Sequence, residues 1–464
     1  MAVNIKMNDK SIGFLKGKKD GGGEKNRRKK ILKVTTIVLS VLLVLLLGGY
    51  YLSQMAGIKL GITDVFNPIK ANPQLEKDSS GEYTNVLFVG IDSRGPNSGL
   101  QNTDTIMLVS YNHEKNYAVM TSIPRDFFVK VPEQERYTKI NGIYAIGERI
   151  QQGEGLNYLK GVVEDVTGRE IQYYGMVNLV GFVDLIDTIG GIEVDVENSF
   201  TDHRYPVEGA ESRYQTISFQ SGLQTMDGTT ALRFVRSRYS MDAYEGSDFA
   251  RARRQQRVIT AVREELLSSS TYLNPRKILN IISVLDNNIK YSKFTNEEIQ
   301  AAIKILQKEE MQTYSFVLDP SIANYQLITD RGLTLDAYAV GPRAGLNNYE
   351  EVHRYVRKTH KKPTLYSEEP SILIYDAGMG YTEAMEKTLE IQEENPYISI
   401  QYMGTLRSDI EGKYFFDNSE LDENINKKIA KEMGFDIVDR PEFLEEQIFN
   451  GDYIILLGSH DQNT

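Results

Sequence analysis

The residues best suited to chemistry lie in one stretch, residues 231–256, which reads ALRFVRSRYSMDAYEGSDFARARRQQ. Arg236 and Arg238 follow an apolar run there, and we expect that run to be a strand. Residues two apart on a strand share a face, so the two guanidinium groups are predicted to point the same way. The alternative is that both are ordinary charges on an edge strand.

A helix is predicted next, from residues 247–248 to about residue 267. At about 100° per residue, one face of this helix carries a stripe made of Arg251, Gln255, Val258, Val262 and Leu266. Arg254 borders the stripe, whereas Arg253 and Arg257 point the other way. An arginine and a glutamine therefore share the face that should meet the core.

Burying a lone guanidinium group is costly, so arginines that face a core or a cleft need an anionic partner. Four arginines close together, with Asp248 between them, indicate a site for a doubly charged, oxygen-rich anion such as pyrophosphate. Asp248 could orient these arginines or accept a proton. It could equally do no more than favour the helix macrodipole, a contribution of about 0.3–1 kcal/mol.

Three apolar segments ahead of this stretch each have a charged residue at one end. They are the segment 85–91 before Asp92, the segment 105–111 after Asp104, and the segment 117–124 before Arg125. Continuous apolar runs are typical of strands buried on both faces, and α/β sheets place end residues in a crevice at their edge. Asp92 and Asp104 could hold Mg²⁺ there, with positions left for water and phosphate. Alternatively, each aspartate caps a turn, and Arg125 forms a surface ion pair with Asp126.

Composition limits the class of protein. The chain has 464 residues, 25% charged and 41% hydrophobic, which is enough for two or three globular domains. It has no cysteine, and its five histidines are scattered, so disulfides, thiolate metal sites and zinc enzymes are not expected. The formal net charge is −11 although the first residues are strongly basic. The remaining acidic body argues against nucleic acid as a partner.

The N-terminal region predicts a membrane anchor. Residues 1–33 are basic and polar, and we expect a disordered cytoplasmic tail. Residues 34–52 carry no charge and are long enough to cross a bilayer, and their basic upstream flank keeps the N-terminus in the cytoplasm. Residues 53–80 form a stalk, and the chain beyond lies outside the cell. A cleaved signal peptide and a buried core helix are the alternatives to this signal anchor.

The rest of the chain alternates helix and strand patterns, which predicts an α/β fold. A first domain spans 81–345, with helices expected near 141–151, 156–167, 179–189, 275–285 and 296–308 and strands near 171–177, 192–196 and 312–317. Residues 198–222 are polar and predict a surface loop with a short hairpin. A further helix is expected near 349–358.

The alternation restarts at Pro370 and predicts a smaller C-terminal α/β domain over 370–464. Its expected elements are strands near 372–378, 398–404 and 452–458 and helices near 382–393, 424–433 and 443–449. No residue pattern in this domain indicates chemistry.

Seven motifs, in order along residues 85–267, resemble those of the LytR-CpsA-Psr family of cell-wall glycopolymer ligases. They are NVLFVGIDSR, TDTIMLVSYN, SIPRDFFV, TKINGIYAIG, FVDLIDTIGGIEVDV, GLQTMDGTTALRFVRSR and GSDFARARRQQRVI. The resemblance implies an α/β/α sandwich on a single transmembrane helix, with a hydrophobic pocket for a prenyl tail. The C-terminal domain more weakly resembles, through ILIYDAG, an accessory domain of some members.

The resemblance also implies roles for single residues. Asp92 and Asp104 resemble the Mg²⁺-associated aspartates, a site that Mn²⁺ could also fill. Asp248 resembles the carboxylate that precedes the helix of the pyrophosphate clamp. That clamp would consist of Arg125, Arg236, Arg238, Arg251 and Gln255, with Lys139 in support. Catalytic roles would fall to Asp92, Arg125, Arg238, Asp248 and Arg251. Asn102 stands where the family usually has an arginine, so the clamp has one cation fewer.

The implied activity is transfer of a phosphoglycopolymer, of the teichoic acid or capsule type, from a polyprenyl-pyrophosphate carrier to a peptidoglycan hydroxyl at the membrane. Mg²⁺ would screen the diphosphate, and the arginines would stabilise the leaving group. Asp92 or Asp248 could act as the general base. Two alternatives use the same clamp: a pyrophosphatase that releases phospho-polymer to water, and a non-catalytic lipid-binding regulator or attenuator. A wall-binding adhesion protein would leave the core-facing arginines unexplained.

Overall fold

The computed structural model describes residues 74–91 and 102–459, apart from short internal gaps, the longest of which are 319–326 and 330–337. The predicted tail, the predicted membrane span, most of the stalk and Asp92 lie outside the described residues. Within the described part of the chain, no helix has both the length and the apolar character needed to cross a bilayer.

A six-stranded sheet forms the centre of the first half of the molecule. Its strands are β1 (Tyr83–Ile91), β2 (Thr103–Asn112), β3 (Tyr117–Ser122), β6 (Tyr173–Asn178), β11 (Ile289–Tyr291) and β12 (Gln312–Val317), in the order β11-β6-β1-β2-β3-β12. β1, β2 and β3 are mutually antiparallel neighbours, whereas β6 runs parallel to β1 and β12 parallel to β3. Consequently the end of β1, the start of β2 and the end of β3 meet at one edge of the sheet.

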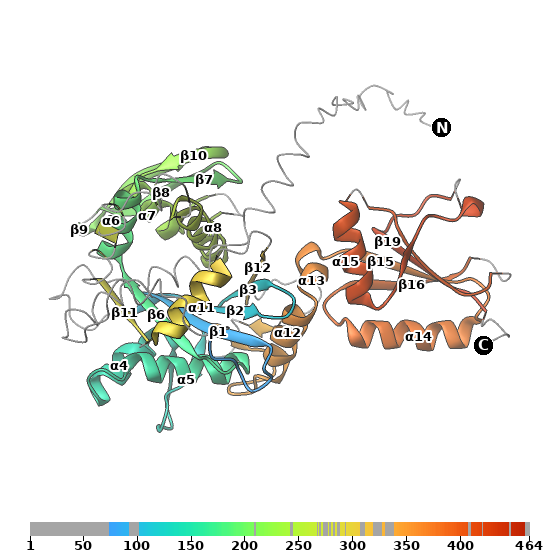
Figure 1. The fold of residues 1–464 in the computed structure, drawn as a ribbon, viewed down its shortest axis with the longest axis horizontal. Coiled ribbons are helices and arrows are strands. Elements are labelled where there is room, and N and C mark those ends of the chain that lie inside the picture. Colours follow the sequence, from blue (N-terminus) through green and yellow to red (C-terminus); the bar gives the residue numbers. More distant parts are fainter. Residues whose placement is uncertain are drawn as a thin grey trace, which may run out of the picture.

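Helices cover both faces of this sheet. Side chains alternate along each strand, so neighbouring residues of one strand pack on opposite faces. Leu87 and Val119 contribute to a buried cluster that includes residues of α4 (Ile143–Ile150), α5 (Gly155–Thr167) and α12 (Glu350–Lys361). Their neighbours on the opposite face, such as Val86 and Met120, join a second cluster with α11 (Asn296–Leu306) and with Ile259 of α8 (Asp248–Leu266). Figure 1 shows the resulting layers, with α4 and α5 on one side of the sheet and α8 and α11 on the other. The expected α/β/α layering is present.

A third buried cluster lies beside the sheet edge. It is formed by α6 (Leu179–Ile189), β7 (Ile192–Val196), β8 (Phe200–Val207), β9 (Ala210–Phe219), β10 (Gly222–Met226), α7 (Gly228–Arg236) and α8. β8 and β9 pair as an antiparallel hairpin, and β7 pairs with β10. The sequence predicted only a surface loop with a short hairpin here. The hairpin is longer because Phe200, Tyr205, Ile217 and Phe219 point into the core, a pattern diluted by the polar residues between them.

Two predicted elements were wrong, the strand that was to carry Arg236 and Arg238 and the helix near 443–449. Arg236 and Arg238 do not lie on a strand, because residues 228–236 form α7. The side chain of Asp227 accepts a hydrogen bond from the Thr230 amide at 2.7 Å, and this cap starts a helix in a run that β-propensity alone would place in a strand. The helix expected near 443–449 is replaced by a three-residue 3-10 turn, Glu442–Leu444. The helix expected near 275–285 falls largely outside the described residues.

The remaining short elements connect these layers. They are β4 (Phe128–Lys130), β5 (Tyr137–Lys139), the 3-10 turn Ile140–Gly142, β13 (Ile328–Thr329) and β14 (Gly341–Pro342). β4 and β5 pair with Phe128 opposite Lys139, which returns the chain to the end of β3.

A second sheet follows in the C-terminal quarter. Its strands are β15 (Ser371–Asp376), β16 (Ser399–Thr405), β17 (Lys413–Asp417), β18 (Ile437–Val438) and β19 (Tyr453–Leu457), in the order β16-β15-β19-β17-β18. Helices α14 (Tyr381–Glu394) and α15 (Glu423–Met433) belong to the same part of the chain. The short helix α13 (Pro363–Glu368) connects α12 to β15. Its predicted strands and first two helices are confirmed, whereas β17 was not predicted.

Helix α12 lies against the back of the first sheet. His360, near its end, is fully buried, and its carbonyl oxygen accepts hydrogen bonds from the hydroxyls of Tyr83 on β1 and Tyr117 on β3, at 3.1 and 2.5 Å. Burial, with a smaller effect of the nearby Arg169 charge, lowers the pKa of His360 well below its ordinary value. The imidazole is therefore neutral in the folded protein at neutral pH.

Candidate active site

At the shared sheet edge, acidic and basic side chains alternate. Asp104 on β2 accepts a hydrogen bond through Oδ1 from Arg125 Nη1 at 2.8 Å. Arg125 Nε lies 3.4 Å from Asp126 Oδ2, and Asp126 Oδ1 in turn accepts from Lys139 Nζ at 2.6 Å. The surface pair Arg125–Asp126 that the sequence allowed is thus one link in a longer chain of charges. This chain fixes two cations, Arg125 and Lys139, beside one partly exposed carboxylate.

Helix α8 forms the facing wall. Gln256 anchors it, since its Nε2 donates to Ser122 Oγ at the end of β3 at 3.0 Å and to the Phe316 carbonyl oxygen at 3.3 Å. Arg251, only 7% exposed, and Gln255 then lie opposite Asp104 and Arg125. We call this space the inner pocket; it is lined by Asp104, Thr105, Ile106, Ser122, Ile123, Pro124, Arg125, Phe249, Arg251, Ala252, Gln255 and Val317.

An apolar cavity of about 110 Å³ opens beside the inner pocket, between the sheet and helices α6, α7 and α8. Its walls are mainly apolar side chains, among them Phe88, Met176, Phe182, Leu232 and Val262. Asp104, Arg236 and Gln255 also line it, and Asp104 and Gln255 line the inner pocket as well. The apolar cavity and the charged inner pocket are therefore adjacent, with Asp104 and Gln255 lining both.

A third space, the outer pocket, lies on the other side of Arg125 and has a volume of about 360 Å³. It is lined by Arg125, Asp126, Lys139, Arg238, Tyr239, Gly246 and Tyr338. Arg125 belongs to both the inner and the outer pocket. The three spaces therefore follow one another in the order apolar, inner and outer.

The predicted site residues can now be placed. The structure brings seven of them to these connected spaces: Asp104, Arg125, Lys139, Arg236, Arg238, Arg251 and Gln255. Arg236 and Arg238 point into different spaces, since α7 ends between them and they do not share a strand face. Asp248 begins α8 as predicted, although its side chain is outside the described set, and so is the whole of Asp92.

Arg254 is a residue whose importance the sequence did not reveal. Its side chain is 1% exposed, and its guanidinium donates to Glu245 Oε2 at 2.6 Å, to the Phe234 carbonyl oxygen at 2.9 Å, and to the carbonyl oxygen of Ser237. Its Cζ also lies 4.8 Å from the centre of the Phe200 ring. Burial lowers the pKa of Arg254, and the Glu245 carboxylate opposes that effect. The side chain joins α8 to the last turn of α7 and to the segment that carries Arg238.

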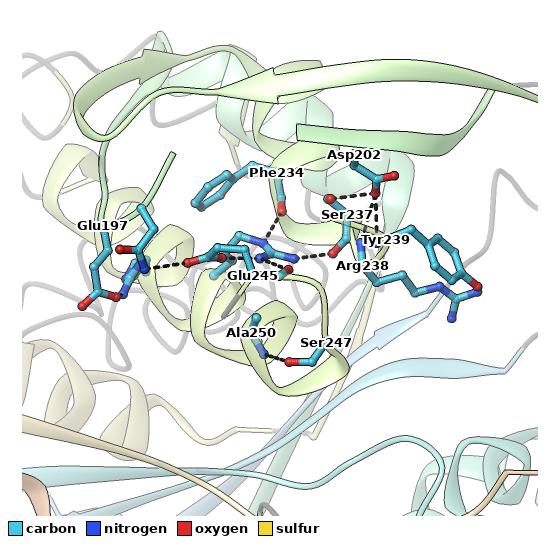
Figure 2. Close-up of polar contacts among 12 residues, drawn as sticks. Glu197, Asp202, Phe234, Ser237, Arg238, Tyr239, Glu245, Ser247 and Ala250 are labelled. Carbon is cyan, nitrogen blue, oxygen red and sulfur yellow. Dashed lines mark hydrogen bonds and ion pairs between the residues drawn. The ribbon is translucent and has the colours of Figure 1, made fainter. Parts of the chain in front are cut away.

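Asp202 on β8 holds the same segment from the other side. Its buried carboxylate accepts hydrogen bonds through Oδ2 from Ser237 Oγ at 2.8 Å and from the amides of Arg238 and Tyr239, both at 3.2 Å (Figure 2). A carboxylate that accepts several bonds from one turn fixes the backbone of that turn. Arg238 is therefore positioned by two buried charges, Asp202 and Arg254, that lie far from it in sequence.

Asp104 is the described carboxylate best placed to hold a divalent cation. Its side chain is 35% exposed, and its pairing with Arg125 uses Oδ1 alone. In the part of the chain that the structure describes, no group of three His, Asp or Glu side chains could hold a metal by itself. Mg²⁺, however, is commonly bound by one or two carboxylates together with waters and substrate phosphates. Asp104 fits a cation of that kind, with Asp92 as the second predicted ligand.

The sequence profile of the LytR_cpsA_psr family matches residues 62–332, more than half of the chain. The chain belongs to this family. The match includes the sheet edge, α7 and α8, and therefore every residue of the three connected spaces apart from Tyr338. The family motifs seen in the sequence thus coincide with the charged walls found in the structure.

Relatives in the LytR_cpsA_psr family have names that refer to the cell wall or to regulation. The chain is 30% identical to the cell wall biosynthesis protein LcpA of Corynebacterium glutamicum, over 44% of this chain and 44% of LcpA. It is 26% identical to the polyisoprenyl-teichoic acid–peptidoglycan teichoic acid transferase TagU of Bacillus cereus, over 52% of this chain and 72% of TagU. It is 30% identical to biofilm regulatory protein A of Streptococcus mutans, over 53% and 60% respectively. The chain thus matches less than half of the length of LcpA.

The chain is also similar to proteins of known structure. TagV of B. subtilis is 25% identical with a TM-score of 0.43, over 61% of this chain and 98% of TagV. TagT bound to LI-WTA is 21% identical with a TM-score of 0.42, over 62% and 95%.

Proposed function

We propose that this protein transfers a phosphoglycopolymer, of the teichoic acid or capsule type, from a polyprenyl-pyrophosphate carrier to a peptidoglycan hydroxyl. The observation that carries the proposal is the direct junction between the apolar cavity and the guanidinium-lined inner pocket, at Asp104 and Gln255. A lipid diphosphate has an apolar chain joined to a doubly charged oxygen-rich group, and few other metabolite classes need both chambers in contact. The names of the relatives LcpA and TagU support the same class of reaction.

In the proposed reaction the prenyl chain occupies the apolar cavity and the diphosphate lies between Arg125, Arg251 and Arg238. Guanidinium groups bind phosphate oxygens through paired N–H donors and stabilise charge without being deprotonated. The acceptor hydroxyl forms a new P–O bond to the phosphorus that bears the polymer. The bond from that phosphorus to the bridging oxygen breaks, and polyprenyl phosphate leaves with the electron pair. The hydroxyl proton passes to a carboxylate, for which Asp92 and Asp248 are the candidates.

Such phosphoryl transfer depends on positioning and charge neutralisation more than on covalent participation by the protein. Arg238 can serve this role because Asp202 and Arg254 fix its backbone before substrate arrives. A Mg²⁺ or Mn²⁺ ion held by Asp104 and Asp92 would add further neutralisation of the diphosphate. Membrane attachment through residues 34–52 would place the site where such lipids are found.

The decisive test uses the full-length protein in detergent, a lipid-diphosphate-linked polymer and peptidoglycan fragments. Arg238→Ala should lower the rate of transfer by about 100-fold or more, since removing one preorganised donor to a developing charge has effects of that order. Product analysis should find the polymer attached to peptidoglycan. Thermal unfolding measured in parallel checks that the variant is folded.

Arg253→Ala is the matched control, because Arg253 is an exposed arginine on the same helix α8 but outside all three spaces. It should transfer polymer at the wild-type rate. Undiminished transfer by a folded Arg238→Ala protein would sink the proposed site. Acceptor-independent release of phospho-polymer would indicate hydrolysis, and lipid binding without any turnover would indicate a regulator.

A further inference from the structure

Beyond the outer pocket, arginine and tyrosine side chains alternate across the surface of the β8–β9 hairpin. Arg238 Cζ lies 4.9 Å from the centre of the Tyr239 ring, and Arg204 Cζ lies 5.1 Å from the same ring. Arg204 Cζ also lies 5.9 Å from the centre of the Tyr214 ring. We call these four residues, Arg238, Tyr239, Arg204 and Tyr214, the arginine–tyrosine row. Two cations thus share one aromatic ring, and a second ring extends the row.

The row is accessible to a ligand. Tyr239 is 41% exposed and Tyr214 54% exposed, which is high for large aromatic side chains, and Arg204 is exposed as well. Among the described residues, no carboxylate pairs with the guanidinium of Arg204 or of Arg238. Cations held over aromatic rings, without a neutralising acid, remain available to bind an external anion.

The row is also built into the site rather than loosely placed beside it. Asp202 at the base of β8 accepts hydrogen bonds from the amides of Arg238 and Tyr239, and through Oδ1 from the amide of Arg204 at 2.8 Å. One buried carboxylate therefore orients the backbone of three of the four members. Figure 2 shows the Arg238 and Tyr239 side chains extending away from Asp202 on the same side. The backbone of these three residues therefore need not be ordered when a ligand binds, which lowers the entropic cost of binding.

The order of the apolar cavity, the inner pocket and the outer pocket indicates which part of the donor reaches the arginine–tyrosine row. A lipid-linked glycopolymer runs from prenyl chain to diphosphate to glycan, and the structure runs from apolar cavity to inner pocket to outer pocket. Tyr239 and Arg238 line the outer pocket and begin the row. The row therefore continues the path at the position where the glycan leaves the diphosphate.

We propose that the arginine–tyrosine row binds the anionic glycan chain of the donor, beyond the sugar attached to the diphosphate. The proposal rests on the proposed transfer function, since it extends the same donor path. Tyrosine rings stack against the apolar faces of sugars while keeping the hydroxyl in water. The arginines bind phosphate or carboxylate groups along the chain. The row thus selects polymers that repeat both a sugar and an anion.

Binding of two donors to the full-length protein in detergent tests this inference. The short probe is a fluorescent polyprenyl diphosphate carrying a single N-acetyl sugar. The long probe carries the same sugar followed by an oligomer of sugar phosphate, so that each repeat has both a sugar ring and an anion. Fluorescence anisotropy gives Kd for each probe without requiring turnover, so the result stands whether or not transfer occurs.

The wild type should bind the long probe more tightly than the short one, and added salt should reduce this advantage. Arg204→Ala and Tyr214→Ala should each reduce the ratio of long-probe to short-probe affinity by about fivefold, the size expected for one exposed cation–aromatic contact. Arg213→Ala is the matched control, because Arg213 is exposed on β9 next to Tyr214 but faces the opposite side of the strand. It removes the same charge and should leave the ratio unchanged.

Equal affinity of the wild type for both probes would overturn the inference, as would an equal effect of Arg213→Ala and Arg204→Ala. If the substitutions change instead only the affinity for soluble peptidoglycan fragments, the row binds the acceptor and the assignment is wrong. Failure of the proposed transfer function is a separate result, seen as absence of polymer–peptidoglycan product from either probe in the wild type.

Discussion

The two sheets of this protein use a strand-end aspartate in opposite ways. At the edge of the first sheet, Asp104 is 35% exposed at its side chain and is paired with Arg125 through one oxygen. At the end of β15 in the second sheet, Asp376 is buried, and its carboxylate accepts from the amides of Gly378 and Gly380 and from the Thr405 hydroxyl. Both aspartates adjoin a buried strand. The difference lies in the donors that surround them.

A buried carboxylate that accepts from backbone amides and from a hydroxyl organises a loop and is not accessible to a ligand. A partly exposed carboxylate that pairs with a guanidinium group through one oxygen keeps its other oxygen available for a metal or a water molecule. The first sheet therefore has a site at its edge, whereas the equivalent edge of the second sheet has a fixed turn.

The largest effect should come from exchanging one aspartate at a time. Asp104→Asn should reduce polymer transfer by roughly 1000-fold, because it removes the carboxylate charge beside Arg125 without changing side-chain volume. Asp376→Asn should leave transfer near the wild-type rate and lower the free energy of unfolding by about 1–3 kcal/mol, because amide donors lose a charged acceptor. Rate assays and urea unfolding separate the two outcomes. Similar loss of transfer in both folded variants would remove the contrast between the sheets.

The same contrast holds for two arginines. Arg238 lines the outer pocket, whereas the buried Arg254 forms hydrogen bonds only within the fold. Arg254→Met should lower the free energy of unfolding by about 3 kcal/mol, because Glu245 is left buried without its partner. The double variant Arg254→Met/Glu245→Leu should recover part of that loss, since no charge is then left buried. Equilibrium urea unfolding measures both. A double variant no more stable than the single one would show that Glu245 is not the reason for the loss.

The smallest effect should come from His360 of α12, on the other side of the first sheet from α8, and it should be a pH-dependent change in the free energy of unfolding. The pKa of His360 is lowered in the folded protein, so only the unfolded chain takes up a proton as pH falls below the ordinary value of 6.5. The free energy of unfolding should then fall by about 1.4 kcal/mol per pH unit relative to a His360→Leu variant, and the two curves should run parallel above that pH. Thermal or urea unfolding between pH 5 and 7.5 checks this. Parallel curves throughout would place the proton uptake elsewhere.

Much of the framework was predictable because its signals are local. The strands β1, β2, β3, β7 and β12 and the helix α8 follow from apolar runs and helical spacing in the sequence. Seven predicted site residues line the connected spaces: Asp104 and Arg125 lie near strand ends, and Arg251 and Gln255 lie on the core-facing side of α8, both of which are local signals. The assignment of Arg236 to a strand failed since the run ALRFVR suits either structure, and the Asp227 cap that decides it precedes the run.

The roles of Arg254 and Asp202 could not be predicted, for a different physical reason. Arg254 is satisfied by Glu245 and by the carbonyl oxygens of Phe234 and Ser237. Asp202 accepts from the Arg238 and Tyr239 amides, 36 and 37 residues away. These partners are brought together only by tertiary packing of the β8–β9 hairpin on α7 and α8. Helical periodicity placed Arg254 at the margin of the core stripe, but it contains no information on what a buried guanidinium would meet.

The position of Asp202 at the base of the β8–β9 hairpin has a consequence for redesigning the protein. It separates the base of the hairpin, which keeps the arginine segment in place, from the part beyond it, which carries the exposed Arg204 and Tyr214 as well as the buried Tyr205. If the proposed transfer function holds, exchanging the exposed residues around Arg204 and Tyr214 while keeping Asp202 and Tyr205 should change which polymer is accepted and leave the backbone of Arg238 in place.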